Sequence, residues 1–215
     1  MTTVSAAGEG SGLRTVLRHA AHAVAIGMSL FHIHAGIFGE APALAYRPIH
    51  LALAFAVLLL TAASMRAPET GAKRWIGLAW DTAMLIAVLA STLFLVFDQT
   101  RISERMEYMT RLLTAERVLG ALLLLVVLDV VRRSIGWPMV VITLVFLVYT
   151  QVGDSLPYPF WHRGYSIDRV IEQMYLTVDG IWTVPLAVTA SYIFLFVLFG
   201  SLLVASGAGE FFTDL

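Results

Sequence analysis

Residues 192–215 read YIFLFVLFGSLLVASGAGEFFTDL, and the apolar run at the start of this stretch decides the fold class. Every side chain over 192–199 is apolar or aromatic, which suits a lipid environment rather than a surface that faces water. Glycines then interrupt the run. Glycine in such a segment permits close helix packing or a break in the helix, and the residues alone favour packing.

The composition supports a membrane protein. The chain has 215 residues, of which 59% are hydrophobic and only 13% charged, whereas a soluble domain carries about 25% charged residues. A net charge of −1 argues against a nucleic-acid partner. Since the chain has no cysteine, disulfides, thiolate metal sites and cysteine nucleophiles are excluded.

Long apolar segments predict an all-α, polytopic transmembrane protein, because a span needs about 20 mostly apolar residues. We expect a four-helix bundle, a fifth span, an amphipathic helix at the membrane interface over 166–180, and a membrane segment broken by glycine. The expected spans lie at about 16–38, 49–63, 76–97, 118–131 and 135–152, with the closing segment at about 181–209.

The distribution of Lys and Arg predicts a cytoplasmic N-terminus, because cytoplasmic loops carry the excess of positive charge. One side of the predicted spans collects seven of these residues, whereas the first opposite loop has only Arg47. The second opposite loop, 98–117, has four arginines, which four acidic residues balance. The seven are Arg14, Arg18, Arg66, Lys73, Arg74, Arg132 and Arg133.

Histidines in the first two predicted spans raise the possibility of haem ligation. They are His19, His22, His32, His34 and His50. Their spacing matches no metal motif, so the favoured interpretation is that the imidazoles bond to backbone or to neighbouring helices.

Charged residues inside the spans call for partners, because charge is costly in lipid. Asp129 has Arg132 and Arg133 three and four residues on, so we expect a local ion pair. Asp81 lies one turn inside its span, where we expect partial hydration. For both, a structural role is favoured over proton or ion handling.

The stretch 98–117, DQTRISERMEYMTRLLTAER, alternates charges at helical spacing. The default interpretation is a solvated helical face, and the sharper one is a docking surface for a soluble partner. No catalytic triad, Walker loop or Rossmann glycine pattern occurs in the sequence, so we expect no enzyme activity.

The second half carries a specific resemblance. In order, it contains VRRSIGWPM and HRGYSIDRVIEQMYLTVDGIWTVPLAVTASYIFLFVLFGSLLVASGAGEFFTDL. Over about residues 25–215 the chain resembles tripartite ATP-independent periplasmic (TRAP) transporter permeases of the fused 4TM/12TM, DctQM-like type that works with TAXI-class solute-binding proteins.

The resemblance implies three parts: a flexible cytoplasmic leader over 1–15, a Q-like four-span scaffold over 16–133, and the beginning of an M-like transport and scaffold domain over 134–215. It further implies ion-gradient-driven solute uptake across a bacterial or archaeal inner membrane, with sodium as the coupled ion. The implied partners are a TAXI-type extracytoplasmic binding protein, the remainder of the M-type permease and membrane lipid. Because family members continue for several hundred residues past the equivalent of EFFTDL, we expect this chain to be incomplete: a fragment, a split-gene product or a truncated gene model.

Two sets of candidate site residues follow. The glycine-punctuated ending supplies candidates for the solute path, and the loop after the fifth span supplies candidates for docking of the binding protein. The solute-path set is Gly200, Ser201, Ser206, Gly207 and Gly209, and the docking set is Trp161, His162 and Arg163. The competing functions are a haem-binding membrane electron carrier and a non-transporting membrane scaffold subunit.

Overall fold

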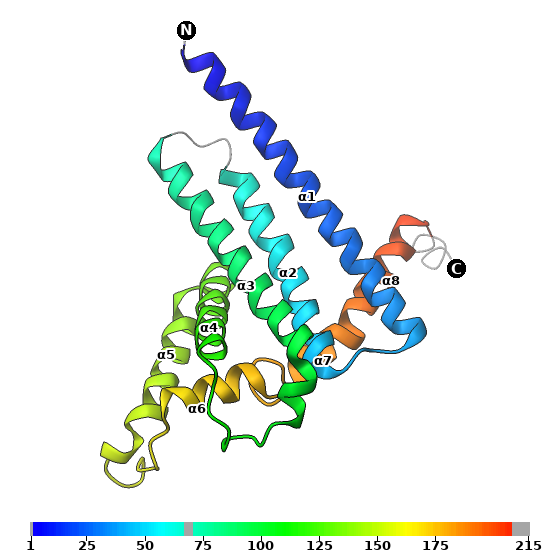
Figure 1. Ribbon diagram of the computed structural model, residues 1–215. Coiled ribbons are helices and arrows are strands. Elements are labelled where there is room, and N and C mark those ends of the chain that lie inside the picture. The colour runs from blue at the N-terminus through cyan, green and yellow to red at the C-terminus, as the bar shows by residue number, and fades with distance from the viewer. Residues whose placement is uncertain (1, 67–70, 208–215) are drawn as a thin grey trace. The chain divides into compact units, whose positions relative to one another are not determined.

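The computed structural model describes residues 2–66 and 71–207, with side chains from residue 12 onward. All the regular secondary structure of the described residues is helical (Figure 1), which confirms the all-α fold. Its contacts divide it into two compact units, with the boundaries inside the third helix and after Ile181. The first unit comprises the described residues up to Ala83 and from Trp182 on, and the second comprises Met84–Ile181.

The first unit is built on two long helices, α1 (Thr2–Phe38) and α2 (Ala43–Arg66), which pack against each other. Small residues such as Ala35, Ala52 and Ala56 are buried, and they let the helices approach closely. The beginning of α3 (Ala72–Glu104) and the closing elements complete the unit. The closing elements are α7 (Val184–Val188), the π-helical turn η3 (Thr189–Ile193) and α8 (Phe194–Ala205).

The closing elements are fixed to α2 by two hydrogen bonds. The Tyr46 hydroxyl donates to the Ala190 carbonyl oxygen over 3.1 Å, and Arg47 Nη1 donates to the Trp182 carbonyl oxygen over 2.5 Å. Because a π-helix leaves the regular pattern of backbone bonds, its carbonyl groups are available to side chains. Tyr46, Ala35 and Ala190 form a small buried cluster together with Phe31.

The second unit contains the rest of α3, α4 (Thr114–Ser134), α5 (Trp137–Val152), the 3₁₀ turn η1 (Gly153–Ser155), α6 (Ile167–Ile171) and the π-helical turn η2 (Glu172–Leu176). Ser91 Oγ on α3 donates to the Leu119 carbonyl oxygen on α4 over 3.0 Å. The Tyr175 hydroxyl donates to the Ser91 carbonyl oxygen over 2.7 Å, so η2 is joined to the same place.

The amphipathic helix expected over 166–180 is confirmed over Ile167–Leu176, whereas residues 177–180 form a turn. It begins at Ser166, whose hydroxyl accepts the Arg169 N–H. Ile171 and Tyr175 are buried, and both side chains lie against Gly120 of α4. Part of the apolar face of this helix therefore serves protein packing rather than the membrane.

Five helical stretches are long and apolar enough to cross a membrane among the residues described: Gly12–Phe38, Ala43–Arg66, Ala72–Glu104, Trp137–Ser155 and Val184–Ala205. Five of the expected membrane segments correspond to them. The expected span at 118–131 does not, because α4 carries Glu116 and Arg117 before this apolar core and Asp129, Arg132 and Arg133 within or after it.

The glycine-marked ending differs in detail from the expected break. Helix α8 continues through Gly200 and ends after Ala205. Gly207 has a φ of 76°, the left-handed conformation that ends helices and that glycine adopts without strain. The departure from regular α-helix lies earlier, at η3.

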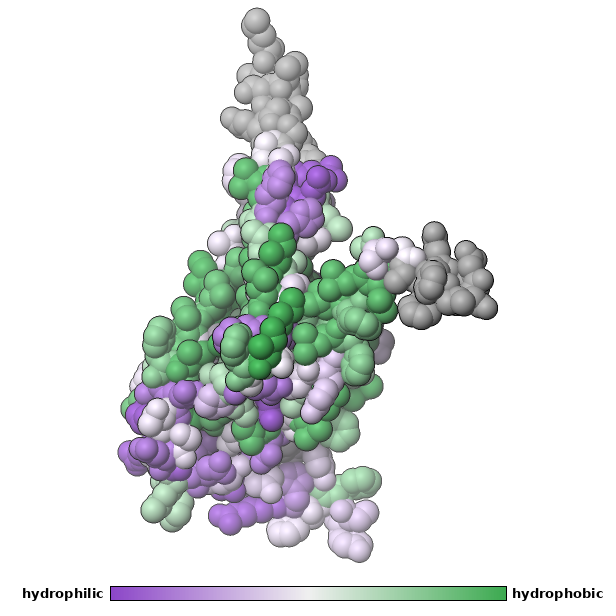
Figure 2. All heavy atoms as spheres, turned by 90° about the vertical axis from the view of Figure 1, so that its right-hand side faces the viewer, coloured by the Kyte–Doolittle hydropathy of each residue, from purple (hydrophilic) through white to green (hydrophobic). Residues whose placement is uncertain are grey.

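Exposed apolar side chains cover α8. Phe196, Val197 and Val204 are each more than half exposed. Figure 2 shows apolar residues spread over this helix and over much of α1. Such a surface is expected where lipid or another membrane helix covers the protein.

Candidate functional site

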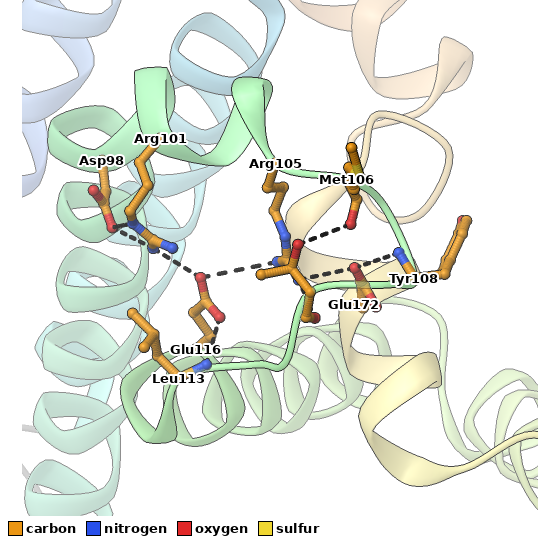
Figure 3. Close-up of polar contacts among 9 residues, drawn as sticks. Asp98, Arg101, Arg105, Met106, Tyr108, Leu113, Glu116 and Glu172 are labelled. Atoms are coloured by element: carbon orange, nitrogen blue, oxygen red, sulfur yellow. Dashed lines mark hydrogen bonds and ion pairs between the residues drawn. The ribbon is translucent and has the colours of Figure 1, made fainter.

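Charged side chains from α3, α4, η2 and the loop between α3 and α4 meet inside the second unit (Figure 3). Arg101, near the end of α3, pairs with Asp98 on its own helix and, over 2.8 Å, with Glu116 of α4. Arg105, in the loop, pairs with Glu172 of η2 over 2.9 Å and lies 3.9 Å from Glu116. These five residues are here called the buried ion network.

The centre of the network is withdrawn from solvent. The side chains of Arg105, Glu116 and Glu172 are 5%, 1% and 7% exposed. The default interpretation of 98–117 as a solvated helical face is therefore wrong for Arg105 and Glu116. The chain turns back after Glu104, and this turn carries Arg105 inward against η2, an arrangement that helical periodicity does not reveal.

Backbone groups complete the bonding of both buried carboxylates. Glu116 Oε2 accepts the Leu113 N–H over 2.7 Å, which is the glutamate half of a capping box at the start of α4. Glu172 Oε1 accepts the Tyr108 N–H over 2.9 Å. Buried charge is tolerated only when it is paired and hydrogen-bonded in this way. The network consequently fixes the path of the loop between α3 and α4.

Two tyrosines beside the network have raised pKa values. Burial is the main cause of the raised pKa of Tyr108, and the Glu107 carboxylate adds to it. Burial likewise raises the pKa of Tyr175, again with a contribution from a carboxylate, that of Glu116. Both phenols therefore stay neutral and act as hydrogen-bond donors at ordinary pH.

The docking candidates lie on a loop that is folded back on the end of α5. Trp161 is 61% exposed, and Arg163 is exposed as well. His162 is half-buried, with its ring 4.6 Å from that of Tyr149 and its Nε2 3.1 Å from the Tyr149 carbonyl oxygen. The His162 N–H also donates to the Gly153 carbonyl oxygen over 3.0 Å. His162 thus anchors the loop, whereas its two neighbours face outward.

Gly153 is needed for this anchor, because a Cβ atom there would lie 2.0 Å from the His162 ring. We expect Gly153→Ala to expel the ring and loosen the loop while α5 stays folded. Hydrogen–deuterium exchange should show faster exchange at the His162 amide. Gly12→Ala is a matched control, since a Cβ there meets no described atom within 4 Å. Unchanged exchange at His162 would contradict the assigned role of Gly153.

The described solute-path candidates lie at the end of the first unit. Gly200 and Ser201 are on α8, where Ser201 Oγ donates to the Leu198 carbonyl oxygen over 2.7 Å. Ser206 Oγ donates to the Leu203 carbonyl oxygen over 2.9 Å, and Gly207 follows the helix end. Gly209 lies outside the described residues. The solute-path and docking candidates belong to different units.

The histidines resolve into one pair and three separate residues. His32 of α1 and His50 of α2 are buried, and Nε2 of His32 lies 2.8 Å from Nδ1 of His50. His32 Nδ1 also lies 2.7 Å from the Met28 carbonyl oxygen. For His32 and His50, this confirms the expectation that the imidazoles bond to backbone or to neighbouring helices. Both nitrogens of His32 and one of His50 are engaged in these bonds, an arrangement that does not favour haem ligation.

The acidic residues in the spans are paired. Asp129 pairs with Arg132 and Arg133 over 2.7 and 2.6 Å, as expected from their spacing. Asp81 is 2% exposed and pairs with Arg66 over 2.5 Å. The expected partial hydration of Asp81 is wrong, because the last turn of α2 brings Arg66 across to α3.

Comparison with known protein families found a match in the second half of the chain. Residues 122–215 match the family described as "Tripartite ATP-independent periplasmic transporter, DctM component". This part of the chain is similar to the DctM component of TRAP transporters. The DctM component is a multi-pass inner-membrane transport protein rather than an enzyme, in agreement with the expected lack of enzyme activity. Searches of curated proteins and of solved structures found no match.

The DctM match begins inside α4, twelve residues before the predicted start of the M-like part at 134. It includes α5, the docking loop, η2 and α8, and hence Glu172 of the buried ion network. The pairing of Arg105 with Glu172 was not predicted from the sequence. No local pattern indicated this contact, because Arg105 lies beside the charged Glu104 and Glu107, and Glu172 is distant along the chain.

Proposed function

We propose that the chain is a permease component of a fused DctQM-like TRAP transporter of the TAXI-associated type. The observation that carries the proposal is the DctM match over residues 122–215. In this proposal residues 16–133 are the Q-like scaffold and residues 134–215 begin the M-like domain. Uptake is driven by an ion gradient, with sodium as the coupled ion and an extracytoplasmic binding protein as the donor of solute.

The proposal places the N-terminus in the cytoplasm. The excess of Lys and Arg on one side of the predicted spans supports this orientation. The proposal counts α4 as the fourth span of the Q-like scaffold, so α5 crosses outward and the loop that holds Trp161, His162 and Arg163 faces the binding protein. The exposure of Trp161 and Arg163 supports this role, because aromatic residues and arginine are enriched at protein interfaces.

The glycines and serines at the end of the described chain are proposed to lie near the solute path. Support comes from the glycine-punctuated sequence and from the helix end at Gly207. In secondary transporters, helix ends and interrupted helices supply the polar groups that meet solute and ions.

The docking role is tested with the full chain in nanodiscs and a TAXI-type binding protein. We expect Trp161→Ala combined with Arg163→Ala to weaken binding about tenfold or more, since interface Trp and Arg are frequent hot spots. Biolayer interferometry would measure the dissociation constant.

Trp137→Ala combined with Arg132→Ala serves as the matched control. Trp137 is 63% exposed and stands at the other end of α5. Equal loss in the two double variants would count against the loop as the docking surface. Binding of a different class of binding protein, with none of the TAXI type, would overturn the TAXI assignment.

A further inference from the structure

A cavity of about 340 Å³ lies within the second unit, and Tyr108 is one of the residues that line it. Its apolar part is formed by Leu147 of α5, Val170 of α6 and Met174 of η2. Its polar part includes Arg169, Thr150 and Tyr165. The volume falls in the range of small-ligand sites, which are mostly apolar with a few placed polar groups.

Arg169 brings an unneutralised positive charge to the cavity. Its guanidinium lies 4.1 Å from the centroid of the Tyr108 ring and 5.8 Å from that of Tyr165. The adjacent carboxylates are engaged elsewhere: Asp168 pairs with Arg117 over 2.8 Å, and Glu172 pairs with Arg105. Within the described residues, the Arg169 guanidinium has cation–π contacts but no ion pair.

Tyr108 is held in place at an energetic cost. Its φ is 62°, a left-handed conformation that is unfavourable for a bulky residue. The Glu172 carboxylate holds its N–H, and Gln173 Oε1 accepts its hydroxyl proton. Figure 3 shows its ring directed away from the ion pairs. A strained backbone conformation that several contacts maintain is frequent at functional sites. Here this conformation places the Tyr108 ring against Arg169.

The position of the cavity narrows the class of ligand. Leu147 and Thr150 lie in the last turns of the candidate span Trp137–Ser155, so the cavity lies where a membrane-spanning helix reaches its end. At that depth, the acyl chains of the bilayer meet their phosphate groups. Arginine binds phosphate strongly, and aromatic residues favour this interfacial zone.

We propose that this cavity is a phospholipid site. The lipid phosphate is bound by Arg169 between the two tyrosines, and the start of an acyl chain lies on Leu147, Val170 and Met174. The site is independent of solute transport, so it stands or falls separately from the proposed function.

The experiment is native mass spectrometry of the full chain in dodecyl maltoside, titrated with phosphatidylglycerol. We expect Arg169→Gln to weaken the adduct about tenfold to a hundredfold, the usual effect of losing a charged hydrogen-bond partner. Arg169→Lys should retain part of the affinity, because it keeps the charge but not the planar group. Arg111→Gln is the control, since it removes an exposed charge from the neighbouring loop.

Two further ligands test separately the contributions of the lipid phosphate and of the acyl chain. Diacylglycerol lacks the phosphate, and inorganic phosphate lacks the acyl chain, so we expect both to bind at least tenfold more weakly than phosphatidylglycerol. Val170→Phe narrows the apolar part of the cavity without touching Arg169, and it should also weaken the lipid adduct. Should Arg169→Gln fail to fold, this variant and Arg169→Lys still decide the question. The proposal would be overturned if Arg169→Gln and Arg111→Gln bound phosphatidylglycerol with equal affinity. It would also be overturned if diacylglycerol or inorganic phosphate bound as tightly as phosphatidylglycerol.

Discussion

Replacing Arg105 with Met is expected to destabilise the second unit by about 3–5 kcal/mol, because the change leaves the buried Glu172 carboxylate without its cation. Glu172 would keep the Tyr108 N–H but lose the guanidinium 2.9 Å away. Glu116 would keep Arg101. The measurement is unfolding of the purified chain in mixed micelles with increasing SDS, followed by circular dichroism.

A surface pair of similar geometry provides the control. Arg117 and Asp168 are 2.8 Å apart, but their side chains are 44% and 48% exposed. Arg117→Met should therefore cost no more than about 1 kcal/mol. In the double variant Arg105→Met with Glu172→Gln, part of the lost stability should return, since the uncompensated charge is gone. Similar losses in Arg105→Met and Arg117→Met would contradict the importance of burial.

Replacing Gly180 with Ala is expected to cost about 3 kcal/mol or more, at the upper end for an overpacked site. A Cβ atom at this position would lie 2.2 Å from the Gln173 carbonyl oxygen and 2.4 Å from the Met174 Cα. These are backbone atoms of η2, which cannot rotate away as a side chain can. The same turn is closed by the Ile181 N–H, which donates to the Met174 carbonyl oxygen over 3.0 Å.

Gly200→Ala is the matched control, because it is the same substitution at a position with free space around it. It lies inside α8, and an added Cβ would meet no described atom within 4 Å. Alanine should stabilise the helix there by about 0.5–1 kcal/mol. The same SDS titration compares the two variants, and a loss at Gly200 as large as that at Gly180 would show that steric contact is not the cause.

Local spacing correctly predicted the features that need only one helix. The pairing of Asp129 with Arg132 and Arg133 follows from neighbours three and four residues apart on a helix. The helical period of the stretch after residue 166 also indicated a helix there, which the structure has over Ile167–Leu176. Likewise, the charge deficit and the long apolar runs were sufficient for an all-α membrane protein.

Sequence spacing alone led to the wrong prediction of solvent exposure for charged residues at helix contacts. Asp81 was expected to be hydrated from its depth in the span, yet Arg66 of another helix reaches it. The alternating charges of 98–117 looked like a solvated face, yet Arg105 and Glu116 are buried. In each case the partner is distant in sequence, so its approach depends on how the helices pack.

The sequence by itself determined the class of protein and the DctM resemblance of its second half. Both rest on composition, on helical periodicity and on the order of short motifs, and none of these requires long-range geometry. Only the tertiary structure decided that Arg105 meets Glu172, that His32 meets His50, and that Arg169 lies over Tyr108. These contacts depend on turns such as the one after Glu104, and side-chain packing fixes which of the possible partners come within bonding distance.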